Sequence, residues 1–218
     1  MSSLLSAKKW FYENRCRLAA NMLHKNGFKT IYMASKNDAL KALLEMIPVG
    51  ATVGVGGSVT IREIGIIDEL IKRGNYVANH WQTNLTGEER REIERKQLTS
   101  DIFLASSNAI TLDGKLVNID GGGNRVASMI FGPGKVIVVA GINKIVKDVD
   151  EGIARIRNIA SPMNAKRLKR NTPCVVTGKC DEEHCESPER LCNILTILEQ
   201  RPSDTDFTVI IVGEELGY

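Results

Sequence analysis

The run "VIVVA", residues 136–140, decides the fold class that this sequence predicts. It is apolar without interruption and rich in β-branched side chains, which is the pattern of a strand covered on both faces. Strands of that kind are typical of parallel sheets, whose connecting helices pack on either side. The run therefore predicts a central strand of an α/β protein.

Predicted helices and short apolar strands alternate along the rest of the chain. Further strands are expected at 28–34, 51–55, 76–81, 101–106 and 207–212. Helices are expected at 4–26, 35–47, 60–72, from Thr86 onward, and 148–160. Residues 109–119 predict a hairpin that turns at Asp113-Gly114. The alternation predicts an α/β fold with a largely parallel sheet flanked by helices.

A single domain accounts for a chain of 218 residues. Residues 1–172 are expected to form the α/β unit. Residues 173–218 are expected to complete the same domain with a cysteine-rich loop, a helix and the final strand. Ser187 and Pro188 predict the start of that helix, as its cap and its first helical residue.

Composition and charge narrow the class of protein. The chain is 43% hydrophobic and 25% charged, with a net charge of +3, which suits a globular protein but argues against nucleic acid as a partner. No apolar run approaches the ~20 residues of a membrane span, and the charged N-terminus does not resemble a signal peptide. We therefore expect a cytoplasmic protein whose five cysteines are thiols or metal ligands rather than disulfides.

The first candidate site is a glycine turn that follows a predicted strand. Gly56, Gly57 and Ser58 lead into a helix near Thr60, and backbone N–H groups at such a helix start favour an anion. Ligands of α/β sheets also collect at the carboxyl ends of strands. The alternative is a tight turn that Ser58 or Thr60 caps. Glu63, one turn into the helix, could face the same cleft or face solvent.

The second candidate site surrounds three glycines in "NIDGGGNR", residues 118–125. Glycine is unfavourable in strands and helices, so the run suggests special backbone angles or a close approach to another group. The candidate ligand-binding and catalytic residues of this site are Asn108, Asn118, Asp120, Gly121, Gly123, Asn124 and Arg125. Buried polar groups must be paired, either with one another in a turn network or with a ligand. Arg125 offers a planar fork suited to a carboxylate or phosphate.

Both candidate sites follow predicted strands, so we expect residues 56–58 and 120–125 to converge on one cleft. Lys144 follows the strand at 136–140 and could reach the same cleft to bind an anion. The alternative for a lone lysine is a solvated surface position.

A cysteine-rich segment near the end of the chain is a candidate metal site. It contains Cys174, Cys180, Cys185 and Cys192. Four thiolates could bind zinc or an iron–sulfur cluster if their sulfur atoms converge, although the spacing matches no standard zinc-finger or ferredoxin motif. Free thiols, a redox pair and a loop that is merely rich in cysteine are the alternatives. Cys16, alone in the first helix, is expected to pack in the core.

Three segments carry a resemblance to a known family: "GVGGSVTIREIG", "SSNAITLDGKLVNIDGGGNRVASMIFGPGKVIVVAGINKIV" and "RIRNIASPMNAKRL". They resemble the lactate-utilisation family, the LUD domain, over about residues 10–218. The resemblance implies a fold similar to ribose-5-phosphate isomerase and the CoA transferases. It also implies a bacterial cytosolic protein connected with oxidising L-lactate to pyruvate. Some members carry an iron–sulfur region whose C-x2-C-x2-C-x3-C-P pattern this chain lacks, so it resembles a single-domain member.

Three functions of different classes remain open. In the first, the chain binds a small anionic metabolite or cofactor within an oxidoreductase system, with an iron–sulfur protein as partner; residues 56–58 and Arg125 hold the anion and the asparagines orient it. In the second, it is a metal- or cluster-carrying accessory subunit without turnover of its own. In the third, it is an acyl or CoA transferase or a sugar-phosphate isomerase, with Glu63 or Asp120 as catalytic carboxylate.

Overall fold

The computed structural model describes residues 2–186 and 188–218, and a sheet of six parallel strands forms its centre. The strand order is β1-β10-β7-β4-β2-β3, with every neighbouring pair parallel. The strands are β1 Lys29–Met33, β2 Val53–Val55, β3 Val77–Asn79, β4 Ile102–Ala105, β7 Lys135–Gly141 and β10 Asp206–Val212. The predicted α/β class with a parallel sheet is confirmed.

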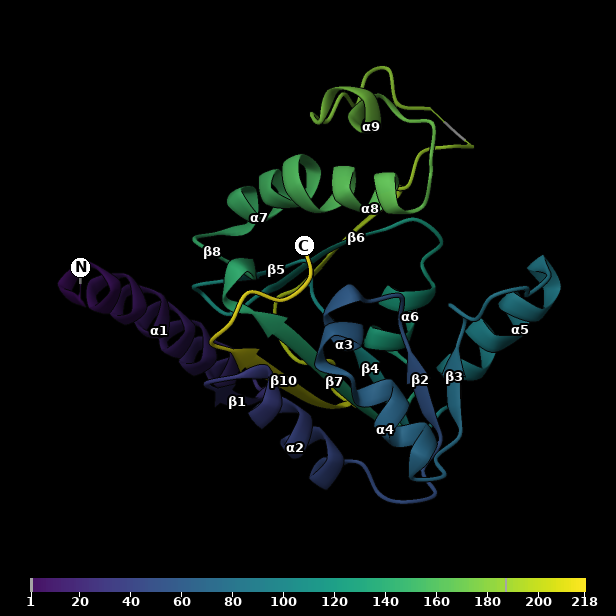
Figure 1. The fold of residues 1–218 in the computed structure, drawn as a ribbon, viewed down its shortest axis with the longest axis horizontal. Helices are drawn as coiled ribbons and strands as arrows, with labels where there is room; N and C mark the ends of the chain where they lie inside the picture. The colour runs from purple at the N-terminus through teal and green to yellow at the C-terminus, as the bar shows by residue number, and fades with distance from the viewer. Residues whose placement is uncertain (1, 187) are drawn as a thin grey trace.

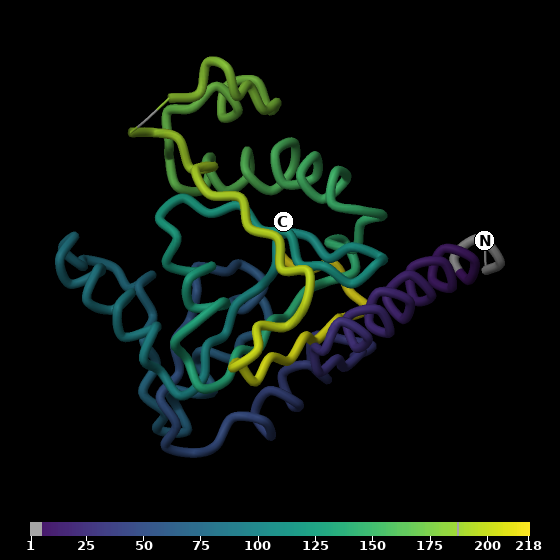
Figure 2. The backbone as a smooth tube through the Cα atoms, turned by 180° about the vertical axis from the view of Figure 1, so that it is seen from behind, coloured from purple at the N-terminus to yellow at the C-terminus, as the bar shows by residue number. Residues whose placement is uncertain are grey.

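Helices cover both faces of this sheet (Figure 1). The helices are α1 Ser2–Lys25, α2 Lys36–Met46, α3 Val59–Ile64, α4 Ile66–Lys72, α5 Gly87–Leu98, α6 Asn124–Ile130, η1 Ile142–Lys144, α7 Val149–Arg155, η2 Ile156–Ala160, α8 Ser161–Arg167 and α9 Pro173–Thr177. The start of α1 extends away from the sheets (Figure 2). Across the described ranges, no helix is both long enough and apolar enough to traverse a membrane.

The central strand β7 is buried on both sides, as its sequence predicts. Val136, Val138 and Ala140 belong to the core that contains residues of α1 and α6. Ile137 and Val139 belong to the core that contains residues of α2, α3 and α4. All five side chains are fully buried. Because alternate side chains of a strand point to opposite faces, an uninterrupted apolar run is what two helical layers require.

A smaller sheet of four strands lies beside the main one, in the order β8-β5-β6-β9. Its strands are β5 Ala109–Thr111, β6 Leu116–Asp120, β8 Ile145–Val146 and β9 Ile194–Leu198. β5 and β6 form the predicted antiparallel hairpin, and β5 pairs in parallel with β8. Ala109 and Val117 pack against α7 and η2, whereas Ile110 and Leu116 join the core of the main sheet. The small sheet therefore lies between the core of the main sheet and the helices α7 and η2.

The helix predicted after Ser187-Pro188 is absent from the described part of this segment. Ser187 lies outside the described residues, Pro188 and Glu189 form a turn, and residues 190–193 are irregular. The next residues form strand β9, which pairs with all five residues of β6. The sequence rule failed here because pairing with the otherwise open edge of β6 outweighs a local helix-start signal.

The helix predicted at 148–160 ends later in the chain than expected. It continues to Arg167, since the π-helical turn η2 joins α7 to α8 without a break. A π turn inserts an extra residue into a helix, and such turns are frequent at functional sites. Ile156 and Ala160 of this turn both line the main cavity of the protein.

Gly114→Ala should destabilise the protein more than Gly74→Ala, although both glycines have φ near +80°. An alanine Cβ at Gly114 would lie 2.5 Å from the backbone carbonyl carbon of Met22 in α1, whereas one at Gly74 would meet nothing within 4 Å. Both variants lose about 1–2 kcal/mol to the left-handed backbone, and only Gly114→Ala must also displace α1. Urea unfolding of the two variants measures the difference, and equal losses would contradict the packing of the hairpin on α1.

Candidate functional site

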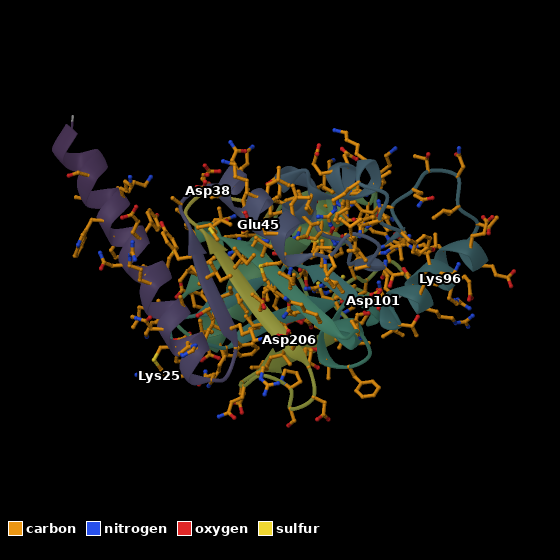
Figure 3. All side chains as sticks on the ribbon, turned by 90° about the horizontal axis from the view of Figure 1, so that it is seen from below. Lys25, Asp38, Glu45, Lys96, Asp101 and Asp206 are labelled. Carbon is orange, nitrogen blue, oxygen red and sulfur yellow. The ribbon has the colours of Figure 1, made fainter. Side chains whose placement is uncertain are left out.

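The main cavity lies at the carboxyl ends of the parallel strands, the edge opposite to the one marked by Asp101 and Asp206 (Figure 3). Its volume is about 510 Å³. Gly57 and Ser58 line it after β2, and residues 120–122 line it after β6. The predicted convergence of these two segments is therefore observed. α8, the segment 188–193 and the C-terminal residue complete the wall.

The glycines after β2 leave room for large side chains of the cavity. A Cβ at Gly56 would lie 3.2 Å from Cγ of Arg125 and 3.0 Å from the ring of Phe103. A Cβ at Gly57 would lie 2.8 Å from Nε1 of Trp81. Ser58 acts as the cap of α3, since its hydroxyl accepts from the N–H of Ile61. The close approach that these glycines allow is made by the protein's own side chains.

The three glycines at 121–123 also have separate roles. Gly123 has φ +84° and begins α6 as its N-cap. A Cβ at Gly121 would lie 3.1 Å from the carbonyl oxygen of Leu191, so this glycine allows the segment before β9 to approach. Gly122 has no close neighbour of this kind apart from Asn124. The run is explained by a helix start and a backbone contact.

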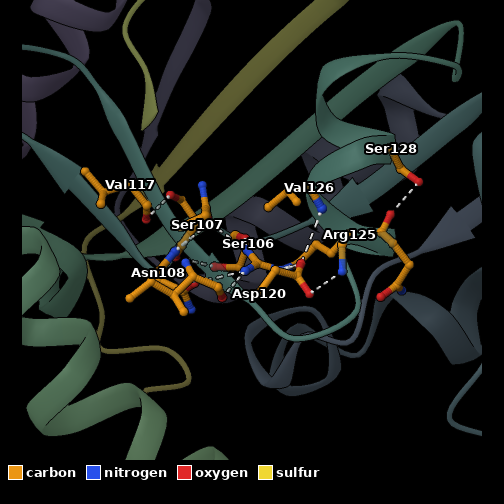
Figure 4. A network of polar contacts seen from close by, with 12 residues as sticks. Ser106, Ser107, Asn108, Val117, Asp120, Arg125, Val126 and Ser128 are labelled. Carbon is orange, nitrogen blue, oxygen red and sulfur yellow. Dashed lines mark hydrogen bonds and ion pairs between the residues drawn. The ribbon is translucent and has the colours of Figure 1, made fainter. Parts of the chain in front are cut away.

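Arg125 joins three segments through all five N–H groups of its guanidinium (Figure 4). Nη1 donates to Asn118 Oδ1 at 2.6 Å and to the Ser106 carbonyl at 3.0 Å. Nη2 donates to Asn108 Oδ1 and to the Ile119 carbonyl, both at 2.9 Å. Nε forms an ion pair with Asp120, 3.4 Å away. The fork that the sequence predicts for an anion is occupied by acceptors of the protein itself.

The polar partners of Arg125 are engaged in the same network. Asn108 Oδ1 accepts from the N–H of Ile119, and Asn118 Oδ1 accepts from the N–H of Asn108. Asp120 accepts from the N–H groups of Gly123 and Val126 at the start of α6. These residues form the turn network that was the alternative to ligand binding. Asp120 as a catalytic carboxylate therefore lacks the free oxygen that such a role needs in this arrangement.

Asn124 differs from the other two asparagines. It lines the cavity at the first position of α6. Its side chain forms no hydrogen bond within residues 2–186 and 188–218. Asn118 Nδ2 is also without a partner there, but the Oδ1 atoms of Asn108 and Asn118 are occupied. Of the three asparagines predicted to orient a ligand, Asn124 is thus the one whose side-chain oxygen is free within the described ranges.

Glu63 lies on α3 and holds the end of the chain. Its Oε2 accepts from the N–H of Gly217 at 2.7 Å, and its side chain is exposed. Thr60, on the same helix, donates to the carbonyl of Leu216 at 3.2 Å. Glu63 is outside the set of residues that line the cavity. Its position favours a role in docking the C-terminal segment over the predicted catalytic role.

Lys144 is buried at the meeting point of three neighbouring strands. It follows β7, and its Nζ lies 2.8 Å from Oγ1 of Thr60, after β2, and 2.9 Å from Oγ of Ser106, after β4. Only 3% of the residue is exposed, and it lines the cavity. Burial and, to a smaller extent, the positive charges of Arg155 and Arg125 lower the pKa of Lys144 to about 7. The solvated alternative is excluded by this burial.

The cavity rim carries a pair of arginines that the sequence analysis did not single out. The guanidinium carbons of Arg62 and Arg167 lie 4.2 Å and 4.1 Å from the ring centroid of Trp81. Burial lowers the pKa of Arg62, and the charge of Arg167 lowers it further. Trp81 and Arg167 line the cavity. Trp81 could have been found from the sequence, because it ends a predicted strand.

Six basic and two acidic side chains line the cavity, but most of the charges are paired. Arg90 pairs with Glu94, Arg125 with Asp120, Arg170 with Glu189 and Arg190 with Glu182. Arg167 is a rim charge without a carboxylate within 4.0 Å in the described part of the chain; its Nη2 donates to Asn164. Lysine and arginine therefore outnumber aspartate and glutamate among the residues that line the cavity.

The four clustered cysteines lie on the segment that begins with α9. Burial raises the pKa of Cys180, and Cys192 raises it further; burial also raises that of Cys185, with smaller effects from Cys174 and Cys192. Cys192 lines the cavity and its Sγ contacts Oγ of Ser161 at 3.1 Å. Across the described residues, no three His, Cys, Asp or Glu side chains are arranged to hold a metal ion. The observed geometry does not fit a zinc or iron–sulfur site, whereas Cys16 is buried in the core as expected.

Both the sequence and the fold match known proteins. Residues 16–212 match the LUD domain. The structure is similar to the crystal structure of a DUF162 family protein from Deinococcus radiodurans at 1.70 Å resolution, with a TM-score of 0.52 and 15% sequence identity. That match covers 93% of this chain and 98% of the other, and at this identity it supports the fold alone. No curated protein matches the chain.

Replacing Arg125 with methionine should lower the free energy of unfolding by about 3–5 kcal/mol, the usual cost of leaving the partners of a buried charge unpaired. Asp120, Asn108 and Asn118 would lose their common donor. Urea unfolding measures the loss. Arg91→Met is the matched control, because Arg91 is exposed and makes no polar contact within the described ranges. A loss no larger than that of the control would contradict the structural role of Arg125.

The stability of the protein relative to Lys144→Met should rise with pH between about 7 and 10. The pKa of Lys144 is lowered from 10.5 to about 7 on folding, so in this interval the unfolded chain binds one more proton than the folded chain. Stability then increases by up to about 1.4 kcal/mol per pH unit, and the variant lacks this contribution. Urea unfolding at pH 7, 8 and 9 gives the difference; a constant difference would show that Lys144 titrates normally.

Proposed function

Since the chain belongs to the LUD-domain family, we propose that it binds a small anionic metabolite or cofactor in the cavity at its strand ends. We further propose that it acts in or beside an L-lactate oxidising system, with an iron–sulfur protein as its partner. The link to lactate rests on the family resemblance. The binding of an anion rests on the charges of the cavity.

The observation that carries the proposal is the unpaired charge of Arg167. Arg62 and Arg167 stack on the same tryptophan, so two positive charges lie close together, and neither forms an ion pair within the described residues. An anion seated beside Trp81 would relieve this repulsion and accept charge-assisted hydrogen bonds from the guanidinium of Arg167. Asn124 offers an uncharged donor among the residues that line the same cavity.

The residues that bind the anion in this proposal therefore differ from those that the sequence predicted. Arg125, Asn108 and Asn118 form the frame of the site and position the segment 120–124, while Arg167 takes the role first expected of Arg125. Gly57 and Ser58 line the cavity and can still approach a ligand. A cavity of about 510 Å³ lies within the range of small-molecule sites.

A metal- or cluster-carrying role of the cysteine segment is the second candidate. Besides burial, Cys174 and Cys192 both raise the pKa values of Cys180 and Cys185, which supports a shared neighbourhood for the thiols. Binding would require the segment 178–186 to rearrange, since its present geometry offers no set of three ligands. Metal analysis and a visible spectrum of anaerobically purified protein distinguish this role from anion binding.

The transferase or isomerase alternative has less support. Its proposed carboxylates are Glu63 and Asp120, and each accepts backbone hydrogen bonds in the structure. Asp120 is also paired with Arg125. A catalytic carboxylate needs an oxygen free to meet substrate.

Arg167→Gln should weaken binding of an anion by about tenfold or more, because a hydrogen bond to a charged group is worth about 1.5–3 kcal/mol. Isothermal titration of the purified protein with L-lactate, pyruvate and phosphate measures the affinity. Arg91→Gln is the control, since it removes the same charge from an exposed site of α5. Wild-type affinity in Arg167→Gln, or no binding of any of the three anions to the wild type, would contradict the proposal.

A further inference from the structure

We propose that Lys144 is a nucleophilic amine that forms an imine with a carbonyl-bearing anion, such as a 2-oxo acid or an aldehyde acid. The inference deepens the proposed function, on which it rests for the anionic character of the ligand. It names a class of substrate and a residue that bonds to it. Lys144 was expected from the sequence to contribute at most a positive charge.

The hydrogen bonds of Lys144 suit an uncharged amine. The hydroxyl of Thr60 donates to the carbonyl of Leu216, and that of Ser106 donates to the carbonyl of Ser107. Each hydroxyl hydrogen is thus committed, and both oxygens are left to accept from Nζ at 2.8 Å and 2.9 Å. A neutral amine has two N–H groups and satisfies both acceptors. The lone pair of Nζ then points in a direction that neither hydroxyl oxygen occupies.

A charged ammonium group would be poorly accommodated at this position. It would have a third N–H, for which the described residues provide no acceptor. The charged groups that face Lys144 are Arg155 of α7, Arg125 of α6 and Glu63 of α3. Two of the three are positive, and Glu63 is exposed and already bonded to Gly217. Burial, followed by the charges of Arg155 and Arg125, lowers the pKa of Lys144 to about 7 against the smaller opposing effect of Glu63, which keeps a large neutral fraction near neutral pH.

The cavity also supplies what the reaction needs besides the amine. Nζ attacks the carbonyl carbon and a C–N bond forms. The carbon–oxygen bond then breaks, and the oxygen leaves as water with one hydrogen of the amine and one proton from solvent, so that the product is a protonated imine. No oxidant or reductant is consumed. A protonated imine keeps one N–H, which Thr60 or Ser106 can still accept. The hydroxyl of Tyr218 is buried without a partner in the described structure, and Tyr218 lines the same cavity, so it offers a donor for the departing oxygen.

Imine trapping tests this directly on the wild-type protein. The protein is incubated with glyoxylate and cyanoborohydride at pH 7, and the modified lysines are located by peptide mass spectrometry. Lys147 is the internal control: it is three residues away and its side chain is 77% exposed. We expect at least tenfold more modification at Lys144 than at Lys147. Modification of Lys144 should reach half its maximum near pH 7.

Absence of an adduct at Lys144, or modification no greater than at Lys147, would overturn the imine. The same protein is titrated with L-lactate, which carries a hydroxyl in place of the carbonyl. If lactate binds and Lys144 is not modified, the imine is wrong and the anion site stands. If Lys144 is modified but neither lactate nor Arg167→Gln alters the rate, the amine is reactive and the proposed anion site is wrong.

Discussion

The guanidinium of Arg125 is the constraint on which the rest of the site depends. It sits where the small sheet meets the carboxyl ends of the main sheet and donates to acceptors after β4, before β5 and along β6. A buried charge is tolerated only when it is paired and hydrogen-bonded throughout. Every acceptor around Arg125 must therefore keep its place, and so must the strand ends that carry them.

That constraint also determines which other charges remain free. Because Arg125 is enclosed by its partners, it adds positive potential to the cavity without offering a donor to a ligand. The same potential, added to that of Arg155, acts on the buried Lys144. Under the proposed function, the direct contacts with an anion fall to Arg167 on the rim, which has no carboxylate within 4.0 Å among the described residues, and to Asn124 at the start of α6.

Much of the fold could be predicted from the sequence, because local signals and tertiary contacts agree over most of the chain. The apolar run of β7, the Asp-Gly hairpin and the cap of α2 at Ser35 all follow local rules. Strand β9 could not be predicted, since its pairing depends on the distant edge of β6. Its partly exposed apolar side chains give no alternating pattern to read.

The candidate site, like the fold, could be predicted from the sequence only in part. The glycines after β2 follow a strand of the parallel sheet, whose carboxyl ends meet at one edge, and those after β6 reach the same cavity from the small sheet. The roles of its residues could not be inferred, since a residue type states what a side chain can do and not whether its donors are already occupied. Arg125 looked available and is enclosed, while Lys144 could have been either a cleft residue or a solvated one and is 3% exposed.

A crystal structure of the protein with a bound 2-oxo acid would test the central claim most directly. The account predicts the carboxylate against Arg167 beside Trp81, the carbonyl carbon directed at Nζ of Lys144, and all five contacts of Arg125 unchanged. A carboxylate held by Arg125, with Asn108 and Asn118 displaced from it, would contradict the claim that this arginine builds the site and does not bind the ligand. An anion bound outside the strand-end cavity would contradict the account as a whole.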